Sequence, residues 1–395
     1  MAHGRRSDAP GRKTIFDPDA STHTALFVHT AALQAYHYPP DCPFKTERAQ
    51  RTVELLQSMG LLDDADMVSA EAAPRDVIER FHLPAYLDML RDAPNGDMGV
   101  EGLEMGLGTP ETPVFGGMYE YAALACGATL AAVDAVTDGR ARRTFNPSGG
   151  YHHAHPAKAG GFCYINDIAL ACDRLTEAGR RVLFLDIDVH HCDGVQDAFY
   201  DRSDVLVMSF HQTGKTLFPG TGFAGETGVG DGEGYTVNVP LPPGTYDEAY
   251  LRAFRALAPP IARAYDPDVI VFEVGMDCLS GDPLAGMTLT NNAYVDVVRE
   301  VLGWGKPVAA TGGGGYHQAN TARGWALLWA ELAERDTGES LAYGLGGVML
   351  ESTDWHGGLR DRAMAPSHPM RQAVDRVIRQ TVDDVKANVF PVHGL

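Results

Sequence analysis

The sequence has no long apolar run. Its longest mostly apolar segment, residues 122–136, is too short and too rich in alanine to span a bilayer. The N-terminus, "MAHGRRSDAPGRK", is basic and polar and has no apolar stretch after it, which is more typical of a loose leader than of a signal peptide. We therefore expect a protein that has no membrane partner.

Cysteine is sparse and scattered. The chain has 6 cysteines, at positions 42, 126, 163, 172, 192 and 278, and no C-x-x-C pair. This pattern argues against both a zinc finger and a disulfide scaffold. A reducing cytoplasm is the compartment that fits best.

Basic residues are also fewer than acidic ones. Lysine and arginine together number 32 against 52 aspartates and glutamates, so the formal net charge is −20. Such a surface repels the phosphates of DNA and RNA, and we expect no nucleic-acid partner. It would attract lysine-rich peptides or polyamines. Many proteins, however, are acidic for solubility alone.

No internal repeat or low-complexity linker divides the chain. Short β-rich runs alternate with helical ones, which predicts an α/β fold with a mostly parallel central sheet and helices on both faces. The expected strands are 25–29, 182–187, 205–210, 269–274 and 307–311, and the expected helices are 47–59, 118–136, 166–177, 245–264, 291–303, 319–334 and 370–388. We expect one domain over 16–395 after a flexible leader (1–15), with a C-terminal helical extension from about 340.

Chemically active residues follow the ends of three expected strands. These clusters are "DVHHCDG", "GMDCLSGDP" and "GGGGYH", and a fourth, "NPSGGYHHAHPAKAGGFCYIND", leads into a helix. Ligands bind at the carboxyl ends of strands in open parallel sheets. The long loops 92–117, 146–162 and 212–244 are expected to form the active site at that edge.

The spacing of Asp188 and His190 favours a metal site. Side chains two residues apart in an extended segment point to the same side, so one carboxylate and one imidazole could bind a single cation. Oxygen and nitrogen ligands together suit zinc or another first-row divalent metal. Asp277 is the best candidate for a third ligand. Three protein ligands and one open position are typical of a catalytic zinc site.

Six stretches carry a family resemblance. They are "GGYHHAHPAKAGGFCYIND", "FLDIDVHHCDGVQDAFY", "FPGTG", "GYTVNVPLPPGT", "GMDCLSGDPLAGMTLT" and "TGGGGYHQANTARGW". In these stretches the chain resembles the zinc-dependent histone deacetylase family, within the arginase/deacetylase fold. It is most similar to bacterial deacetylases of the acetoin-utilisation type, as the early stretch "YHYPPDCPFKTERA" also indicates.

The resemblance implies a metal-dependent amidohydrolase. Asp188, His190 and Asp277 would bind Zn²⁺, with Fe²⁺ as the alternative in the cell. The metal would polarise the acetyl carbonyl and acidify a bound water.

The resemblance also implies the acid–base groups. His153 would be the general base and then the general acid, a role that requires a pKa near neutrality. His152 would tune charge and orientation, with Asp186 as its partner, and Asp193 would be the partner of His153. Tyr316 would donate a hydrogen bond to the oxyanion opposite the metal.

The resemblance further implies a narrow apolar substrate channel. Phe162 and Phe218 would form its walls, Gly161 would let the substrate pass close to the backbone, and Leu284 would lie at the rim. Glu111 falls roughly where the family has an aspartate that binds the substrate backbone, and the longer side chain is a departure.

Other positions are matched on the same basis. Arg48 matches an arginine that lines an internal cavity behind the metal. Cys192 stands where many relatives have glycine, and we interpret it as a passive thiol rather than a ligand. Structural K⁺ or Na⁺ would bind at one site formed by Asp186, Asp188, His190, Ser209 and Phe210, and at a second formed by Phe199, Arg202, Val205 and Tyr235.

Three rival functions make different demands on the residues. A two-manganese ureohydrolase needs a second aspartate at position 275, which is glycine. A deacetylase of acetylpolyamines suits the net charge, but Leu284 argues against it. A binding protein that had lost catalysis should lack one of the key residues, and all are present. The sequence therefore predicts a bacterial enzyme that removes acetyl from lysine ε-amines of proteins, with small acetylated amines as the alternative substrate.

Overall fold

The structure is a computed structural model, and it describes residues 23–96, 98–337, 359–364 and 366–395. The predicted leader (1–15) lies outside the described residues, as does the start of the predicted C-terminal extension near 340.

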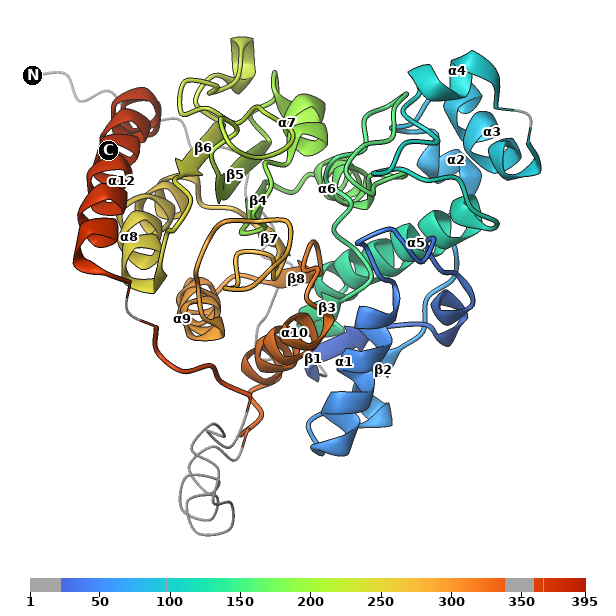
Figure 1. Cartoon of the computed structure of the whole chain (residues 1–395), viewed down its shortest axis with the longest axis horizontal. Helices are drawn as coiled ribbons and strands as arrows, with labels where there is room; N and C mark the ends of the chain where they lie inside the picture. The colour runs from blue at the N-terminus through green and yellow to red at the C-terminus, as the bar shows by residue number, and fades with distance from the viewer. Residues whose placement is uncertain (1–22, 97, 338–358, 365) are drawn as a thin grey trace, which may run out of the picture.

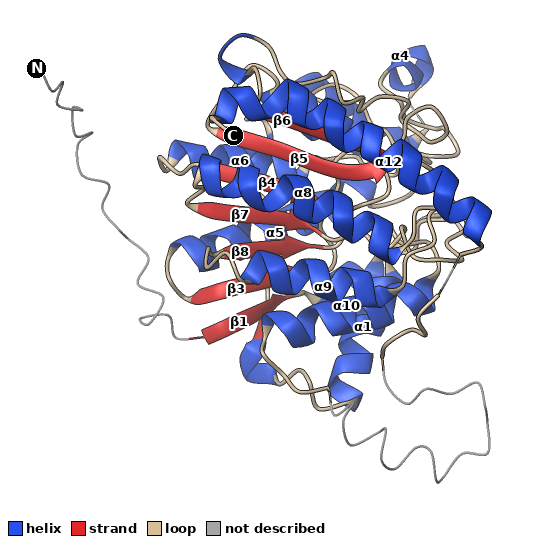
Figure 2. Ribbon diagram, turned by 90° about the vertical axis from the view of Figure 1, so that its left-hand side faces the viewer, coloured by secondary structure: helices blue, strands red, loops and turns tan. Residues whose placement is uncertain are grey.

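A single parallel sheet forms the centre of the described chain (Figures 1 and 2). Its eight strands follow the order β2-β1-β3-β8-β7-β4-β5-β6, and every neighbouring pair is parallel. The strands are β1 (His23–Val28), β2 (Met67–Val68), β3 (Ala141–Asn146), β4 (Val182–Asp186), β5 (Val205–Gln212), β6 (Thr236–Leu241), β7 (Val269–Glu273) and β8 (Val308–Thr311). Because all strands run the same way, their carboxyl ends share one edge. The predicted fold class is confirmed.

Helices cover both faces of the sheet. One layer contains α1 (Glu47–Ser58), α8 (Asp247–Tyr265), α9 (Asn291–Leu302), α10 (Gln318–Leu332) and α12 (His368–Val389), which lie in front of the sheet in Figure 2. The other contains α3 (Pro84–Asp92), α5 (Met118–Thr137), α6 (Asp167–Glu177) and α7 (Asp193–Phe199), with the short α2 (Arg75–Ile78) and α4 (Gly99–Glu104) nearby.

The central strands are apolar on both sides because both faces are covered. In β4, Leu183 and Leu185 pack into the layer of α8 and α9, whereas Val182 and Phe184 pack into the layer of α5 and α6. This alternation follows from the two-residue period of a strand. The sheet is thereby fixed rigidly between two cores.

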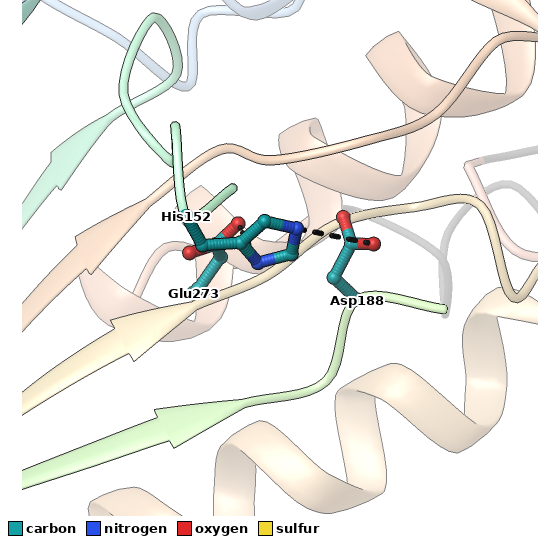
Figure 3. A group of neighbouring side chains, drawn as sticks. All are labelled: His152, Asp188 and Glu273. Carbon is teal, nitrogen blue, oxygen red and sulfur yellow. Dashed lines mark ion pairs between the residues drawn. The ribbon is translucent and has the colours of Figure 1, made fainter. Parts of the chain in front are cut away.

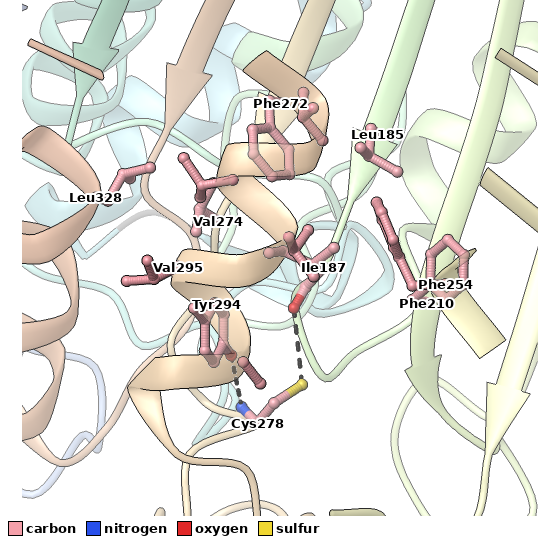
Figure 4. Close-up of a cluster of buried hydrophobic side chains, with 14 of the residues drawn as sticks. Leu185, Ile187, Phe210, Phe254, Phe272, Val274, Cys278, Tyr294, Val295 and Leu328 are labelled. Atoms are coloured by element: carbon pink, nitrogen blue, oxygen red, sulfur yellow. Dashed lines mark hydrogen bonds between the residues drawn. The ribbon is translucent and has the colours of Figure 1, made fainter. Parts of the chain in front are cut away.

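The first of these cores reaches the site edge. Figure 4 shows Val274 near Val295 of α9, and Tyr294 of the same helix next to Cys278. The hydroxyl of Tyr294 accepts a hydrogen bond from the Cys278 backbone N–H at 3.3 Å. The apolar packing therefore supports the segment that directly follows β7.

Three strands differ from the prediction, among them the two-residue β2, which was not predicted. β6 lies inside the predicted loop 212–244, and β3, with the sequence "ARRTFN", was not predicted. Its Arg143 is buried, but the guanidinium donates to the Leu332 carbonyl at 2.8 Å and contacts Glu334 at 2.9 Å. The arginine stem covers apolar surface while its charged end finds partners, so a strand with two arginines can lie inside the sheet.

Within the described ranges, no helix combines the length and the apolar character needed to cross a bilayer.

Candidate active site

The residues singled out from the sequence meet at the carboxyl edge of the sheet. Asp186 ends β4, Glu273 ends β7, and the glycine run 312–315 follows β8. The 147–166 connection after β3 brings the two adjacent histidines to the same place. Segments far apart in sequence therefore supply one site.

Three side chains form a compact buried cluster. His190 Nδ1 lies 3.1 Å from Asp188 Oδ1 and 3.1 Å from Asp277 Oδ2. Ligand atoms bound about 2.1 Å from a tetrahedral ion lie about 3.4 Å from one another, so these separations match the edges of such a site. A neutral imidazole nitrogen could share a proton with only one of the two carboxylates, whereas a cation between the three groups would satisfy all of them. The donor set fits a divalent metal.

Backbone N–H groups aim the two carboxylates. Asp277 Oδ1 accepts from the Val189 N–H at 2.9 Å, which leaves Oδ2 directed at His190. Asp188 Oδ2 accepts from the Gly314 N–H at 2.6 Å. A Cβ atom on Gly314 would lie 1.9 Å from Asp277 Oδ2, so only glycine permits this approach.

The pKa values of His190 and Asp277 indicate the sign of the electrostatic potential at the cluster. Burial by itself would lower the pKa of His190, but Asp188 and Asp277 raise that pKa to about 10. Burial and the Asp188 charge together raise the pKa of Asp277 to about 7. Two carboxylates beside one imidazole therefore form an electronegative site that favours a cation.

The two adjacent histidines face one another. His152 Nε2 lies 3.1 Å from His153 Nε2. On their far sides, His152 Nδ1 lies 3.0 Å from Asp186 Oδ2, and His153 Nδ1 lies 2.7 Å from Asp193 Oδ1. Both expected carboxylate contacts are present.

The environments of these histidines push their pKa values apart. Burial opposes charge on His152, yet Glu273 and Asp186 raise its pKa well above the usual range. Burial and the charge of His152 lower the pKa of His153 to about 4, below the near-neutral value expected from the sequence. At neutral pH, His152 is therefore the charged member of the pair and His153 the neutral one.

A second carboxylate beside His152 was missed by the sequence analysis. Glu273 Oε1 lies 2.9 Å from His152 Nδ1, and Figure 3 shows His152 between Glu273 and Asp188. Apart from this approach, neither oxygen of Glu273 has a hydrogen-bond partner among the described residues. The signal in the sequence was a single charged residue inside the apolar run "VIVFEV".

Steric crowding explains why position 275 is glycine. A Cβ atom there would lie 1.9 Å from Asp188 Oδ2, so the second aspartate that a two-manganese site needs would not fit this backbone.

Tyr316 lies at the rim of the cluster. Its ring is 6.2 Å from the ring of His190 and 5.5 Å from that of Phe162. The Asp282 carboxylate accepts from the Tyr316 N–H at 2.7 Å and from the Leu284 N–H at 2.9 Å. Asp282, which the sequence analysis assigned no role, thus orients two of the expected site residues.

A cavity of about 260 Å³ leads to these residues. It is lined by Pro43, Pro110, Glu111, His153, Gly161, Phe162, His190, Leu217, Phe218, Leu284 and Tyr316. All five expected substrate-binding residues are among them. The walls are mostly apolar, and the polar side chains in the lining are Glu111, His153, His190 and Tyr316.

The local backbone conformation explains why position 161 is glycine. Its φ is +49°, and a Cβ there would lie 2.3 Å from His153 Cδ2 and 2.9 Å from the Phe218 ring. The next residue, Phe162, also has a positive φ of 66°, and its N–H donates to the Glu111 carbonyl at 3.0 Å. This connection is what places Phe162 in the channel wall.

Arg48 lies behind the site. Its guanidinium donates to the carbonyls of Gly315 (2.7 Å) and Gly313 (3.0 Å) and stacks over Phe44. Arg48 thereby supports the glycine run that carries Tyr316.

The residues expected to bind monovalent cations lie in two places. Ser209 pairs in register with Asp186, and its hydroxyl contacts His211 Nδ1 at 2.8 Å. In the second group, the Phe199 carbonyl accepts from Arg202 N–H and the Tyr235 carbonyl accepts from Val207 N–H. Of the remaining expected positions, Val205 begins β5 and Phe210 lies within it.

Cys192 is fully buried at the start of α7. Burial and the nearby carboxylates raise the pKa of its thiol well above the usual range. A protonated thiol is a poor metal ligand, which agrees with a passive role.

Comparison with known proteins identifies relatives of this arrangement. A family model described as "Histone deacetylase domain" matches residues 42–332. The acetoin utilization protein AcuC of Bacillus subtilis is 38% identical over 327 residues, which cover 80% of this chain and 84% of that protein. Histone deacetylase 8 of Xenopus tropicalis is 38% identical over 292 residues, covering 73% and 78% of the two chains.

Solved structures agree. The crystal structure of an HDAC homolog from Aquifex aeolicus superposes with a TM-score of 0.80 at 32% identity and covers 92% of this chain and 99% of that one. An HDAC homolog complexed with SAHA gives a TM-score of 0.81 at 30% identity, with the same coverage.

Proposed function

Because this chain belongs to the histone deacetylase family and is therefore a deacetylase, we propose that it hydrolyses the acetyl amide of ε-acetyl-lysine in proteins and releases acetate. One observation carries the proposal. A mostly apolar cavity of about 260 Å³ is lined by His153, His190 and Tyr316, and His190 belongs to the compact cluster with Asp188 and Asp277. Such a cavity suits an uncharged acetyl group at the end of four methylenes.

The metal that this family requires has a fitting donor set in Asp188, His190 and Asp277. When bound there, Zn²⁺ or Fe²⁺ would supply a Lewis acid that polarises the acyl carbonyl and acidifies water.

His153 is the proposed proton carrier. Asp193 accepts the hydrogen bond from its Nδ1–H, which leaves Nε2 as the unprotonated nitrogen that would take a proton from the attacking water. The same proton then passes to the amine nitrogen as the C–N bond breaks. His152, kept charged by Asp186 and Glu273, would orient water and keep His153 neutral, and so able to accept a proton, before the reaction.

Tyr316 is the proposed oxyanion donor. Its hydroxyl would donate to the oxygen that becomes negative in the transition state, and burial keeps the phenol protonated by raising its pKa well above the usual range. Phe162 and Phe218 would hold the methylenes between them.

Two accompanying features belong to the same proposal. Structural K⁺ or Na⁺ would bind the backbone oxygens near Ser209 and near Phe199. A reducing cytoplasm is the proposed location, because all six cysteines are free and buried.

A second candidate substrate is a small acetylated amine such as an acetylpolyamine. The observation that favours it is the exposed carboxylate of Glu111 at the cavity lining, which would attract a distal ammonium group.

Acetate release by the metal-loaded protein tests both candidates. An acetyl-lysine peptide and N-acetylputrescine would be compared side by side, using Tyr316→Phe and, as a matched control outside the cavity lining, Tyr119→Phe. We expect peptide turnover that falls roughly 100- to 1,000-fold in Tyr316→Phe, mainly in kcat, and stays near wild type in Tyr119→Phe.

Each other outcome has a definite meaning. Turnover of the polyamine alone would move the function to small-molecule metabolism. Turnover of neither substrate would contradict the proposed function.

A further inference from the structure

A third histidine lies beyond the two that face the metal site. His153 Nδ1 contacts Asp193 Oδ1 at 2.7 Å, Asp193 Oδ2 contacts His155 Nε2 at 3.4 Å, and His155 Nδ1 contacts Asp197 Oδ2 at 3.3 Å. The four side chains therefore form an unbroken alternation of imidazole and carboxylate.

This alternation runs from the interior to solvent. The exposed fractions of the side chains rise from 5% for His153 to 19% for Asp193, 27% for His155 and 61% for Asp197. Only the inner end reaches the cavity, because His153 lines it and the other three do not. Any effect of His155 on the reaction would therefore pass through Asp193.

The backbone fixes where His155 lies. His155 N–H donates to the Lys158 carbonyl at 2.9 Å, and Lys158 N–H donates back at 3.3 Å. Asp193 and Asp197 come from consecutive turns of α7, four residues apart, so both face the ring from one helix. A single imidazole can bridge two carboxylates so placed.

The ring is cationic in this position. Hydrogen bonds to Asp193 and Asp197 raise the pKa of His155 to about 9. The other titratable groups near it are His153, Lys158 on the same hairpin, and His82, whose pKa burial lowers to about 3. His82 is therefore neutral, and Asp193 and Asp197 dominate the charge around His155.

We propose that His155 is a positioning residue for deacetylation, which fixes the rotation and the ionised state of the Asp193 carboxylate on which His153 depends. Each oxygen of Asp193 then has its own imidazole, so the carboxylate cannot turn away from His153. This inference rests on the proposed function, in which His153 carries the proton.

An ordinary surface ion pair is the competing explanation. Exposed pairs contribute little to stability, and a pair of that kind would leave catalysis unaffected. The experiment must therefore measure kcat rather than stability alone.

The first test compares two substitutions of His155 in the full-length, metal-loaded chain with the acetyl-lysine peptide. His155→Gln keeps hydrogen-bonding capacity and removes the charge, whereas His155→Lys restores a cation. We expect His155→Gln to lower kcat roughly tenfold with KM within about twofold, and His155→Lys to recover most of the loss. Circular dichroism and thermal unfolding verify that both variants fold.

The second test uses Asp197→Asn, which removes the outer carboxylate and so lowers the pKa of His155. The ratio of its kcat to that of wild type should fall several-fold between pH 6.5 and pH 8.5, towards the value of His155→Gln, because the ring loses its proton earlier. A purely structural role of His155 would give a ratio that does not change with pH.

The outcomes separate the two proposals. An active wild type with His155→Gln at wild-type kcat overturns the inference and leaves the proposed function intact. A loss of kcat that His155→Lys does not recover, together with a pH-independent Asp197→Asn ratio, also overturns it. A wild type that turns over neither substrate overturns the proposed function, and the role of His155 with it.

Discussion

Two buried carboxylates share one imidazole nitrogen at the ends of β4 and β7. Asp186 and Glu273 are paired in register, and His152 Nδ1 lies within 3.0 Å of both. Burial, together with the Asp186 charge, raises the pKa of Glu273 well above its usual range, although His152 opposes the shift. The arrangement stores electrostatic repulsion that a neutral side chain would relieve.

We therefore expect Glu273→Gln to stabilise the metal-free protein while impairing catalysis. The free energy of unfolding should rise by about 1–2 kcal/mol, since the repulsion between two buried carboxylates is removed and one of them still faces His152. The kcat should fall, because His152 loses one of the carboxylates that keep it charged. Guanidinium unfolding and steady-state kinetics provide the two measurements. A variant that is destabilised by a similar amount would show instead that the carboxylate is a well-compensated partner of His152.

At the residue scale, sequence reasoning succeeded where spacing carries chemistry. Asp188 and His190, two residues apart after a strand, are found together with Asp277 because parallel strands end at one edge. It failed for Glu273 and Asp282, whose roles depend on strand register and loop shape rather than on a local pattern. The resemblance alone pointed to Phe162 and Phe218, because an aromatic residue in a loop carries no signal of its own.

At the scale of elements, the connection between β5 and β6 carries the channel wall. It contains Phe218 and is tied down by Glu226, which accepts from the N–H groups of Gly222 (3.1 Å) and Phe223 (3.0 Å). The same carboxylate accepts from Gln196 of α7 at 2.9 Å. One side chain therefore joins this connection to the helix that carries Asp193.

Glu226→Gln should loosen that wall. The amide has one acceptor oxygen in place of two, so at least one of the three hydrogen bonds is lost. We expect KM for the acetyl-lysine peptide to rise roughly three- to tenfold, with a smaller change in kcat. Glu233→Gln, an exposed position in the same connection, is the matched control. Equal KM values for the two variants would mean that Glu226 does not position the wall.

The elements were predicted unevenly. β4, β5, β7 and β8 were recognised because strands buried on both faces are continuous apolar runs. β6 was hidden among glycines and prolines, since it forms the edge of the sheet and alternates less clearly. The short helices α2, α4 and α7, of four to seven residues, are too brief for a helical period to stand out.

At the scale of the whole molecule, the C-terminal helix closes the fold beside the sheet edge. α12 packs against α8 and β6, burying Val374, Ile378, Val385 and Val389. Thr381 also donates to the Pro240 carbonyl of β6 at 3.1 Å. The helix therefore covers part of an edge strand that would otherwise be open to pairing with other chains.

Truncating its buried residues should weaken the fold and spare the chemistry. Ile378→Ala should lower the free energy of unfolding by about 2–4 kcal/mol, because Ile378 is 3% exposed. Val377→Ala, at a side chain that is 42% exposed, should change it by less than about 0.5 kcal/mol. Denaturant unfolding measures both, and kcat/KM well below the unfolding transition should stay near wild type. A similar loss for the two variants would contradict this account of the helix.

The burial of the six cysteines has a practical consequence for site-specific labelling of the enzyme. Each is at most 4% exposed in the folded chain. Thiol reagents modify thiolates that they can reach, so the native protein is almost silent towards them. A single cysteine introduced at the mouth of the cavity would then accept a fluorophore without prior removal of the natural ones. Unfolding exposes all six thiols at once, so they then react with the reagent. The rate of their modification therefore measures the loss of the fold.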